Sequence, residues 1–146
     1  MESLFQESFH LTEHLIYGKI KTTELLKSVI EIPNEQRLKD SLKINEIVEY
    51  QENHLKKHGC YNFLGVINIH FNKDDSKYYI VDGQHRYFAI RKLTNQGHSS
   101  IMIMVELVYV ENMEQLKSNY ELINKNTELP EFPDTIDKNI PETVAN

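Results

Sequence analysis

The sequence contains very little cysteine and no tryptophan: Cys60 is the single thiol in 146 residues. A lone cysteine excludes an intrachain disulfide, so the packing of a hydrophobic core has to hold the fold together. No apolar run approaches the roughly 20 residues of a membrane-spanning helix, and residues 1–7 lack the basic start and apolar centre of a secretory signal. We therefore expect an intracellular protein, cytoplasmic or in the nucleoid or nucleus, that is not secreted and has no membrane partner.

Arginine is scarce as well. The chain has only Arg37, Arg86 and Arg91, and its 22 acidic residues outnumber the 16 basic ones to give a net charge of −6. Residues 128–146 alone carry −4, so the rest of the chain is close to neutral. Nonspecific DNA binding depends on many contacts between basic side chains and phosphates. This composition excludes a broad basic surface, and any contact with nucleic acid would be local.

The remaining composition, 40% hydrophobic and 26% charged residues, is that of one soluble globular domain. We divide the chain into an N-terminal helical extension (1–32), a main domain (33–127) and an acidic, proline-containing tail (128–146) that is expected to be extended or disordered. The extension is predicted from two helical stripes of apolar residues, with a break at Tyr17-Gly18. Pro33 marks its end, because a proline disfavours helical backbone in the residue before it.

The spacing of apolar residues predicts the elements of the main domain. Strands are expected at 61–71, 78–82 and 100–110, and helices at 35–57, 84–96 and 113–125. The last strand is apolar on both faces, which is typical of the middle of a covered sheet. The first two strands form an antiparallel hairpin, and Asn112 with Gln115 forms a capping box for the last helix. The fold class is α/β (α+β), a small mixed β-sheet packed by helices. The predicted core consists of Leu42, Ile47, Ile67, Ile69, Ile80, Ile90, Leu93, Ile103, Val105, Leu116 and Ile123.

Residues 78–93, YYIVDGQHRYFAIRKL, are the stretch around which this domain is organised. A short run of β-branched and aromatic residues meets the turn signal Asp82-Gly83, and the apolar spacing beyond it is helical. We predict a strand, a tight turn and a helix, with Asp82 capping the helix and Gly83 allowing a tight turn or a close approach to a ligand. A helix N-terminus favours anions. Arg86 in the first turn offers a fork of donors for phosphate, and His85 can donate, accept or titrate. The alternative is an ordinary helix start with solvated cations.

His54, His58 and Cys60 could gather as metal ligands at the end of the 35–57 helix. Zinc would need a fourth ligand, and His70 is the only near candidate in the sequence. An exposed helix C-terminus explains these residues better, because positive charge suits that end of the helix dipole. No zinc is expected.

The sequence Asp82-Gly83-Gln84-His85-Arg86 matches the signature of the DGQHR-domain family, a branch of the ParB/sulfiredoxin-like superfamily. Two further segments resemble the family: Pro33-Asn34-Glu35-Gln36-Arg37 before the first helix of the main domain, and Leu122-Ile123-Asn124-Lys125-Asn126-Thr127 at the end of the last one. The resemblance covers about residues 33–130 and implies a ParB/sulfiredoxin-like fold.

The same resemblance implies a site that binds a nucleotide or another phosphate ligand. The implied cofactor is a nucleoside triphosphate with Mg²⁺, DNA is a further partner, and the oligomeric state is left open. The implied binding residues are Asp82, Gly83, Gln84, His85, Arg86 and Asn124, with Arg37 and Arg91 in support and no protein metal ligands. A structural role for Arg37 and local helix capping by Asn124 explain these two residues equally well.

Departures from the superfamily narrow the function. Sulfiredoxins carry a reducing cysteine at the position of Gln84, so sulfinic-acid reduction is not expected. ParB partition proteins have a second nucleotide-contacting motif and a helix-turn-helix. Neither is recognisable here, so we do not expect a CTP-gated DNA clamp. A nuclease needs acidic metal ligands, and Asp82 is the only obvious acid at the pocket.

Three classes of function follow from these observations. The first is a nucleotide- or phosphate-binding ParB-like domain that acts in DNA metabolism or its regulation. The second is an enzyme with the same pocket, a nucleotide hydrolase or nuclease, with His85 as the candidate catalytic residue. The third is a noncatalytic protein-interaction module that keeps the motif for structure, with Arg86 as a salt-bridge partner of Asp82 or Glu106.

Overall fold

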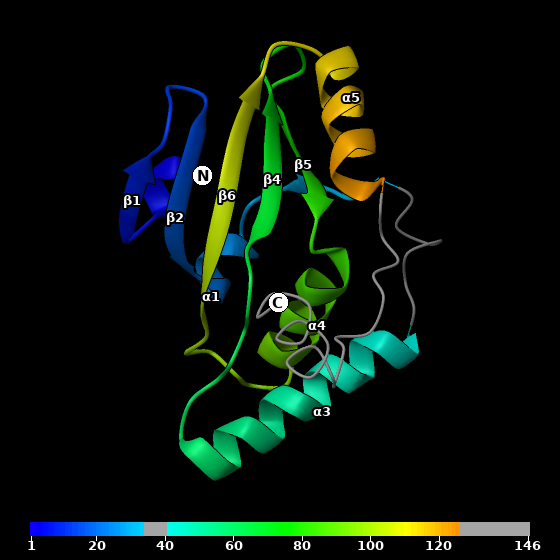
Figure 1. Cartoon of the computed structure of the whole chain (residues 1–146). Coiled ribbons are helices and arrows are strands. Elements are labelled where there is room, and N and C mark those ends of the chain that lie inside the picture. The colour runs from blue at the N-terminus through cyan, green and yellow to red at the C-terminus, as the bar shows by residue number, and fades with distance from the viewer. Residues whose placement is uncertain (34–40, 126–146) are drawn as a thin grey trace, which may run out of the picture.

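The computed structural model describes residues 1–33 and 41–125, which form a six-stranded mixed sheet in the order β1-β2-β6-β4-β5-β3 (Figure 1). The strands are β1 (Glu7–His10), β2 (Leu15–Lys21), β3 (Ile30–Glu31), β4 (Ile67–Asn72), β5 (Lys77–Asp82) and β6 (Met102–Val110). The helices are η1 (Glu2–Leu4), α1 (Thr22–Leu25), α3 (Ser41–His58), α4 (Gln84–Asn95) and α5 (Met113–Asn124). The first residues of the predicted 35–57 helix, Arg37 and the acidic tail lie outside the described residues.

The position of β6 confirms half of the expectation drawn from its two apolar faces. The strand is central, but only the face with Ile103, Val105 and Leu107 is well buried, and Met104 on the other face is 41% exposed. β6 pairs with β2 in antiparallel and with β4 in parallel orientation, so it has a neighbour on each side. β4 and β5 form the predicted antiparallel hairpin. Figure 1 shows α5 against one end of this hairpin and α3 with α4 at the other end. A mixed sheet packed by helices is the predicted fold class.

The N-terminal 32 residues are not the predicted helical extension. β1 and β2 form a hairpin, and β2 continues the sheet beside β6 along its whole length. Residues Ile16, Gly18 and Ile20 are buried, and they alternate with half-buried neighbours, so the period is two. Pairing with a strand far along the chain has overridden the local helical spacing, as tertiary context commonly does. Within residues 1–32, helical turns are limited to η1 and the single turn of α1.

The helices of the main domain agree better with the sequence. α5 starts after Asn112, whose side chain accepts a hydrogen bond from the N–H of Gln115 at 2.9 Å. The Gln115 side chain in turn accepts from the N–H of Glu111, also at 2.9 Å. α4 ends before Gly97, whose φ of 99° ends the helix. The predicted 61–71 strand is shorter than expected, because residues 61–66 form a loop held by side chains of α3 and α4.

The main core lies between one face of the sheet and the helices α1, α3 and α4, and a smaller cluster lies under α5. Eight predicted core residues are buried: Ile67, Ile69, Ile80, Ile90, Leu93, Ile103, Val105 and Leu116. Ile47 is only half-buried. The prediction for Leu42 is wrong. Its side chain is 69% exposed, because the buried face of α3 carries Val48 and Gln51. Ile123 is also wrong at 41% exposure, because the last turn of α5 directs Asn124 towards β5 instead.

Among the described residues, no helix combines the length and the apolar composition needed to cross a membrane.

Candidate functional site

The predicted strand, turn and helix are present at the motif. Gly83 follows β5 directly and is the N-cap of α4, with a left-handed φ of 88°. A Cβ atom at this position would lie 3.2 Å from Cγ1 and 3.3 Å from Cα of Ile67, so both the conformation and the space favour glycine. Asp82 was expected to cap the helix and does not. It lies one residue before the N-cap, and no side chain forms a cap hydrogen bond.

The carbonyl of Val81 brings two motif segments together. Val81 lies in β5 where the pairing with β4 shifts register between Asn68 and Ile69, so the hairpin has an irregularity at this point. The Val81 carbonyl oxygen accepts hydrogen bonds from Nε2 of Gln84 and Nδ2 of Asn124, each at 3.0 Å. Asn124 therefore lies beside the motif, as the resemblance implies. However, Gln84 and Asn124 use these amide donors to stabilise the backbone, and Gln84 is only 7% exposed.

A groove of about 450 Å³ lies at the N-terminus of α4. It is lined by Asp82, Gly83, Gln84, His85 and Arg86, and on the α3 side by Lys43, Glu46 and Ile47. The side chains of Asp82, His85 and Glu46 make no hydrogen bond or ion pair within the described residues. These three polar groups are therefore available to a ligand.

The Arg86 side chain lies at the edge of this groove and contacts the loop before β4. Its Nη1 donates a hydrogen bond to the carbonyl of Leu64 at 2.7 Å. No ion pair joins Arg86 to Asp82 or Glu106 in the described structure, which contradicts the salt-bridge alternative. The Glu106 carboxylate instead accepts hydrogen bonds from Tyr17 Oη and Asn68 Nδ2, each at 2.5 Å.

Of the two supporting arginines, the structure describes only Arg91, which does not line this groove. Arg37 lies outside the described residues. The guanidinium of Arg91 stacks over the rings of Phe88 and Tyr87, at 5.1 and 5.9 Å from their centroids. It lines a different groove with Ser41 and other residues of α3 and α4.

The electrostatics of the motif groove are mixed. The N-terminus of α4 carries the positive end of the helix dipole, and Arg86 and Lys43 add positive charge. Asp82 and Glu46 add two carboxylates on the same groove. Sequence reasoning did not identify Lys43 and Glu46. Their spacing of three residues places them on one helix face, but nothing in the sequence alone shows that this face lies opposite the motif.

His54 and His58, the two histidines considered as metal ligands, lie with their ring centroids 4.5 Å apart at the end of α3. No group of three or more histidine, cysteine or acidic side chains that could hold a metal is found in the described ranges. His54 Nδ1 lies 2.7 Å from the carbonyl oxygen of Cys60, so this imidazole helps to close the end of α3.

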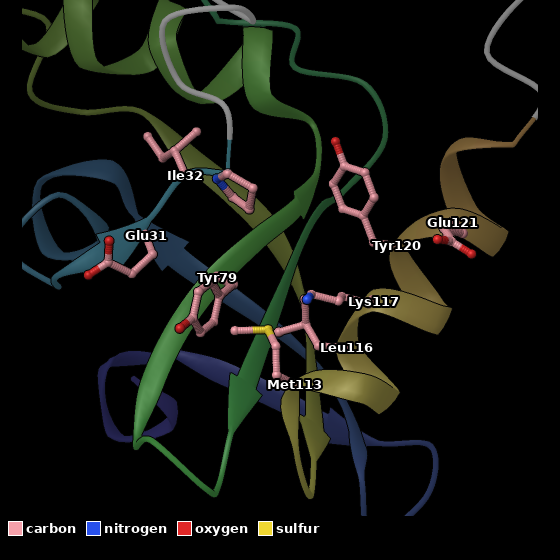
Figure 2. Close-up of a pocket in the computed structure, with 9 residues that line it drawn as sticks. Glu31, Ile32, Tyr79, Met113, Leu116, Lys117, Tyr120 and Glu121 are labelled. Carbon is pink, nitrogen blue, oxygen red and sulfur yellow. The ribbon is translucent and has the colours of Figure 1, made fainter.

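A second hollow, of about 390 Å³, lies between α5 and the strand pair β3–β5 (Figure 2). Figure 2 shows Tyr79 and Tyr120 on opposite sides of it, with Met113 and Leu116 between them. No motif residue lines this hollow, so it is separate from the groove at α4.

No protein-family model matches the chain, and no curated protein matches it. Sulfiredoxin from Arabidopsis thaliana is 19% identical over 70% of this chain and 93% of its own, with a TM-score of 0.43. The C-terminally truncated ParB from Caulobacter crescentus, complexed with CTP-gamma-S, is 15% identical over 77% of this chain, with a TM-score of 0.41. A Pnob8-like ParB-N domain is 14% identical over 84% of this chain, also with a TM-score of 0.41. The chain spans 55% and 41% of these two ParB chains. At these TM-scores the likeness assigns neither a function nor the DGQHR family.

Proposed function

We propose that the groove at α4 binds the phosphate groups of a nucleotide together with Mg²⁺, and that this ParB-like domain acts in DNA metabolism or its regulation. One observation carries the proposal. α4 starts at a left-handed glycine without a capping side chain, and its first turn lines a groove beside Arg86. The N–H groups of a first helical turn have no partner within the helix. Together with an arginine fork they form a ready anion site.

The two carboxylates in the groove explain why we include Mg²⁺. Asp82 and Glu46 would repel a bare phosphate. Mg²⁺ is commonly held by one or two carboxylates together with the phosphates of the ligand, and both carboxylates lie uncommitted on this groove. When bound, the ion would offset the charge of the phosphates. The resemblance of the five-residue motif to the DGQHR family supports the same class of ligand.

The test is isothermal titration calorimetry with CTP, ATP and inorganic triphosphate, each with and without Mg²⁺. We expect binding that is stronger with Mg²⁺. Arg86→Ala should weaken it by about ten- to a hundredfold, because a lost hydrogen bond to a charged group costs about 1.5–3 kcal/mol. Arg86→Lys should restore part of the affinity, since an ammonium group cannot form the fork.

Arg91→Ala is the matched control. It removes an arginine from the same helix, but from a different groove, so the affinity should change less than about twofold. Thermal melting of each variant shows whether it is folded. A folded Arg86→Ala protein with undiminished affinity would refute the proposed site. Absence of binding by all three probes would favour the noncatalytic interaction module.

His85 favours a second candidate function, a hydrolase that uses the same groove. Its imidazole lines the groove and has no polar partner in the described structure. Histidine is the side chain that most often serves as a general acid or base in enzymes. Release of inorganic phosphate from Mg²⁺-bound CTP or ATP, abolished in His85→Ala while binding persists, would establish this function. No release by the wild-type protein would exclude it for these nucleotides and leave the binding function intact.

A further inference from the structure

Residues 62–65 form a loop between α3 and β4 that is held from two sides. One contact comes from Gln51 on α3 and the other from Arg86 on α4. Gln51 and Arg86 are 35 positions apart in the sequence. The loop therefore links the buried face of α3 to the groove that contains the motif.

Gln51 is only 3% exposed, and its amide forms two hydrogen bonds with the backbone of Asn62. Nε2 donates to the Asn62 carbonyl at 2.9 Å, and Oε1 accepts from the Asn62 N–H at 2.7 Å. A buried glutamine is uncommon unless its polar atoms are paired. Because the two bonds run in opposite directions, they hold both the position and the orientation of the loop.

At the other end of the loop, Leu64 and Gly65 contact the Arg86 guanidinium closely. Leu64 accepts the bond from Nη1 at 2.7 Å. Gly65 adopts a left-handed φ of 80°, and a Cβ atom there would lie 2.6 Å from Nη1. Any side chain at position 65 would push the guanidinium away. Within the described residues, one hydrogen bond uses one of the five N–H donors of this side chain, so further donors can serve a ligand.

We infer that Gln51 is a positioning residue for phosphate recognition: it holds the 62–65 loop, and the loop holds Arg86 at the groove. This inference rests on the proposed function. A long arginine side chain loses conformational freedom when a ligand orders it, and a group that is already held avoids much of that cost. Gln51 does not line the groove at α4. It lines an adjoining hollow with Arg86, and its hydrogen bonds go to the loop, so we expect it to act through the loop.

The experiment measures the affinity for inorganic triphosphate with Mg²⁺ in Gln51→Met, Arg86→Ala and the double variant. Methionine is similar in size to glutamine but removes both amide hydrogen bonds. We expect Gln51→Met to weaken binding by about two- to tenfold, the cost of ordering one flexible side chain. In the Arg86→Ala background the same substitution should cause no further loss. A purely structural role would lower the melting temperature but would not make the affinity change depend on Arg86.

Tyr50→Phe is the matched control for the loop. It removes the hydroxyl that accepts a bond from Asn62 Nδ2 at 2.8 Å and leaves both Gln51 bonds in place, so the triphosphate affinity should stay within about twofold. Gly65→Ala perturbs the other end of the loop and should reproduce the Arg86-dependent loss. If Gln51→Met does not fold, Gly65→Ala still tests whether the loop holds Arg86, and wild-type affinity in a folded Gly65→Ala protein would overturn the inference.

Folded Gln51→Met and Gly65→Ala proteins with wild-type affinity would overturn the inference. An equal loss in the presence and absence of Arg86 would overturn it as well. Both results leave the proposed function standing, provided that Arg86→Ala alone weakens binding. If Arg86→Ala binds triphosphate as well as the wild type, the proposed function itself is wrong.

Discussion

Lowering the pH from 7.5 to 5 should destabilise the protein through His70, a residue of β4 that is 1% exposed. Its Nε2 lies 3.1 Å from Nδ2 of Asn119 on α5, and its Nδ1 is buried without a partner in the described structure. Burial lowers the pKa of His70 from its ordinary value of 6.5 to about 4, although the negative charge of Glu106 acts in the opposite direction. The native state therefore holds a neutral imidazole.

The size and direction of the effect follow from this pKa. Because the pKa is lower in the folded than in the unfolded chain, the unfolded state takes up the proton first as the pH falls. The contribution of His70 to stability is complete above about pH 6.5 and is lost between about pH 6.5 and 4. One pKa unit corresponds to about 1.4 kcal/mol, so the total loss is about 3 kcal/mol. About 2 kcal/mol of it should be lost by pH 5.

The assay is urea denaturation at several pH values for the wild type and for His70→Leu. Leucine fills the buried position and removes the titration, and Asn119 is half-buried and can turn to water. The difference between the unfolding free energies of the wild type and the variant should shift by about 2 kcal/mol in favour of the variant as the pH falls from 7.5 to 5. His14→Gln is the control for the loss of a histidine elsewhere in the chain, because the His14 side chain is exposed and lies outside β4.

A constant difference between wild type and His70→Leu from pH 7.5 to 5 would refute this reasoning. It would mean that His70 keeps an ordinary pKa in the folded protein, and that water or a local opening of α5 solvates its imidazole.

Two further substitutions test the packing of the sheet and the turn. Ile103→Ala, at a β6 position that is 6% exposed, should lower the free energy of unfolding in urea by about 2–5 kcal/mol; a loss below about 1 kcal/mol would contradict its place in the core. Gly83→Ala has to adopt a φ of 88° and contact Ile67 at 3.2 Å, so it should destabilise the protein by about 1–3 kcal/mol. An unchanged melting temperature for Gly83→Ala would show that the turn accepts another conformation.

Local sequence patterns predicted much of the main domain. The two apolar faces of 100–110 indicated a central strand, because strands with two apolar faces are typical of the middle of a sheet. β6 does lie between β2 and β4, although Met104 on one face is 41% exposed. Asn112 indicated the start of α5, because the capping bond to Gln115 spans only three residues. The N-terminal prediction failed for the opposite reason. The apolar residues of 1–32 allow a helical spacing, and the partner that makes Leu15–Lys21 a strand is β6, much later in the chain.

The candidate site shows the same division. By itself, the sequence determined the strand, the turn at Gly83 and the start of α4, because each depends on the conformational preferences of adjacent residues. Only the tertiary structure decided what the side chains do. Gln84 and Asn124 meet at the Val81 carbonyl, Lys43 and Glu46 line the groove from α3, and the guanidinium of Arg86 lies on the 62–65 loop. These contacts join segments that are remote in the sequence. Their positions follow from packing against a common core, which no local pattern encodes.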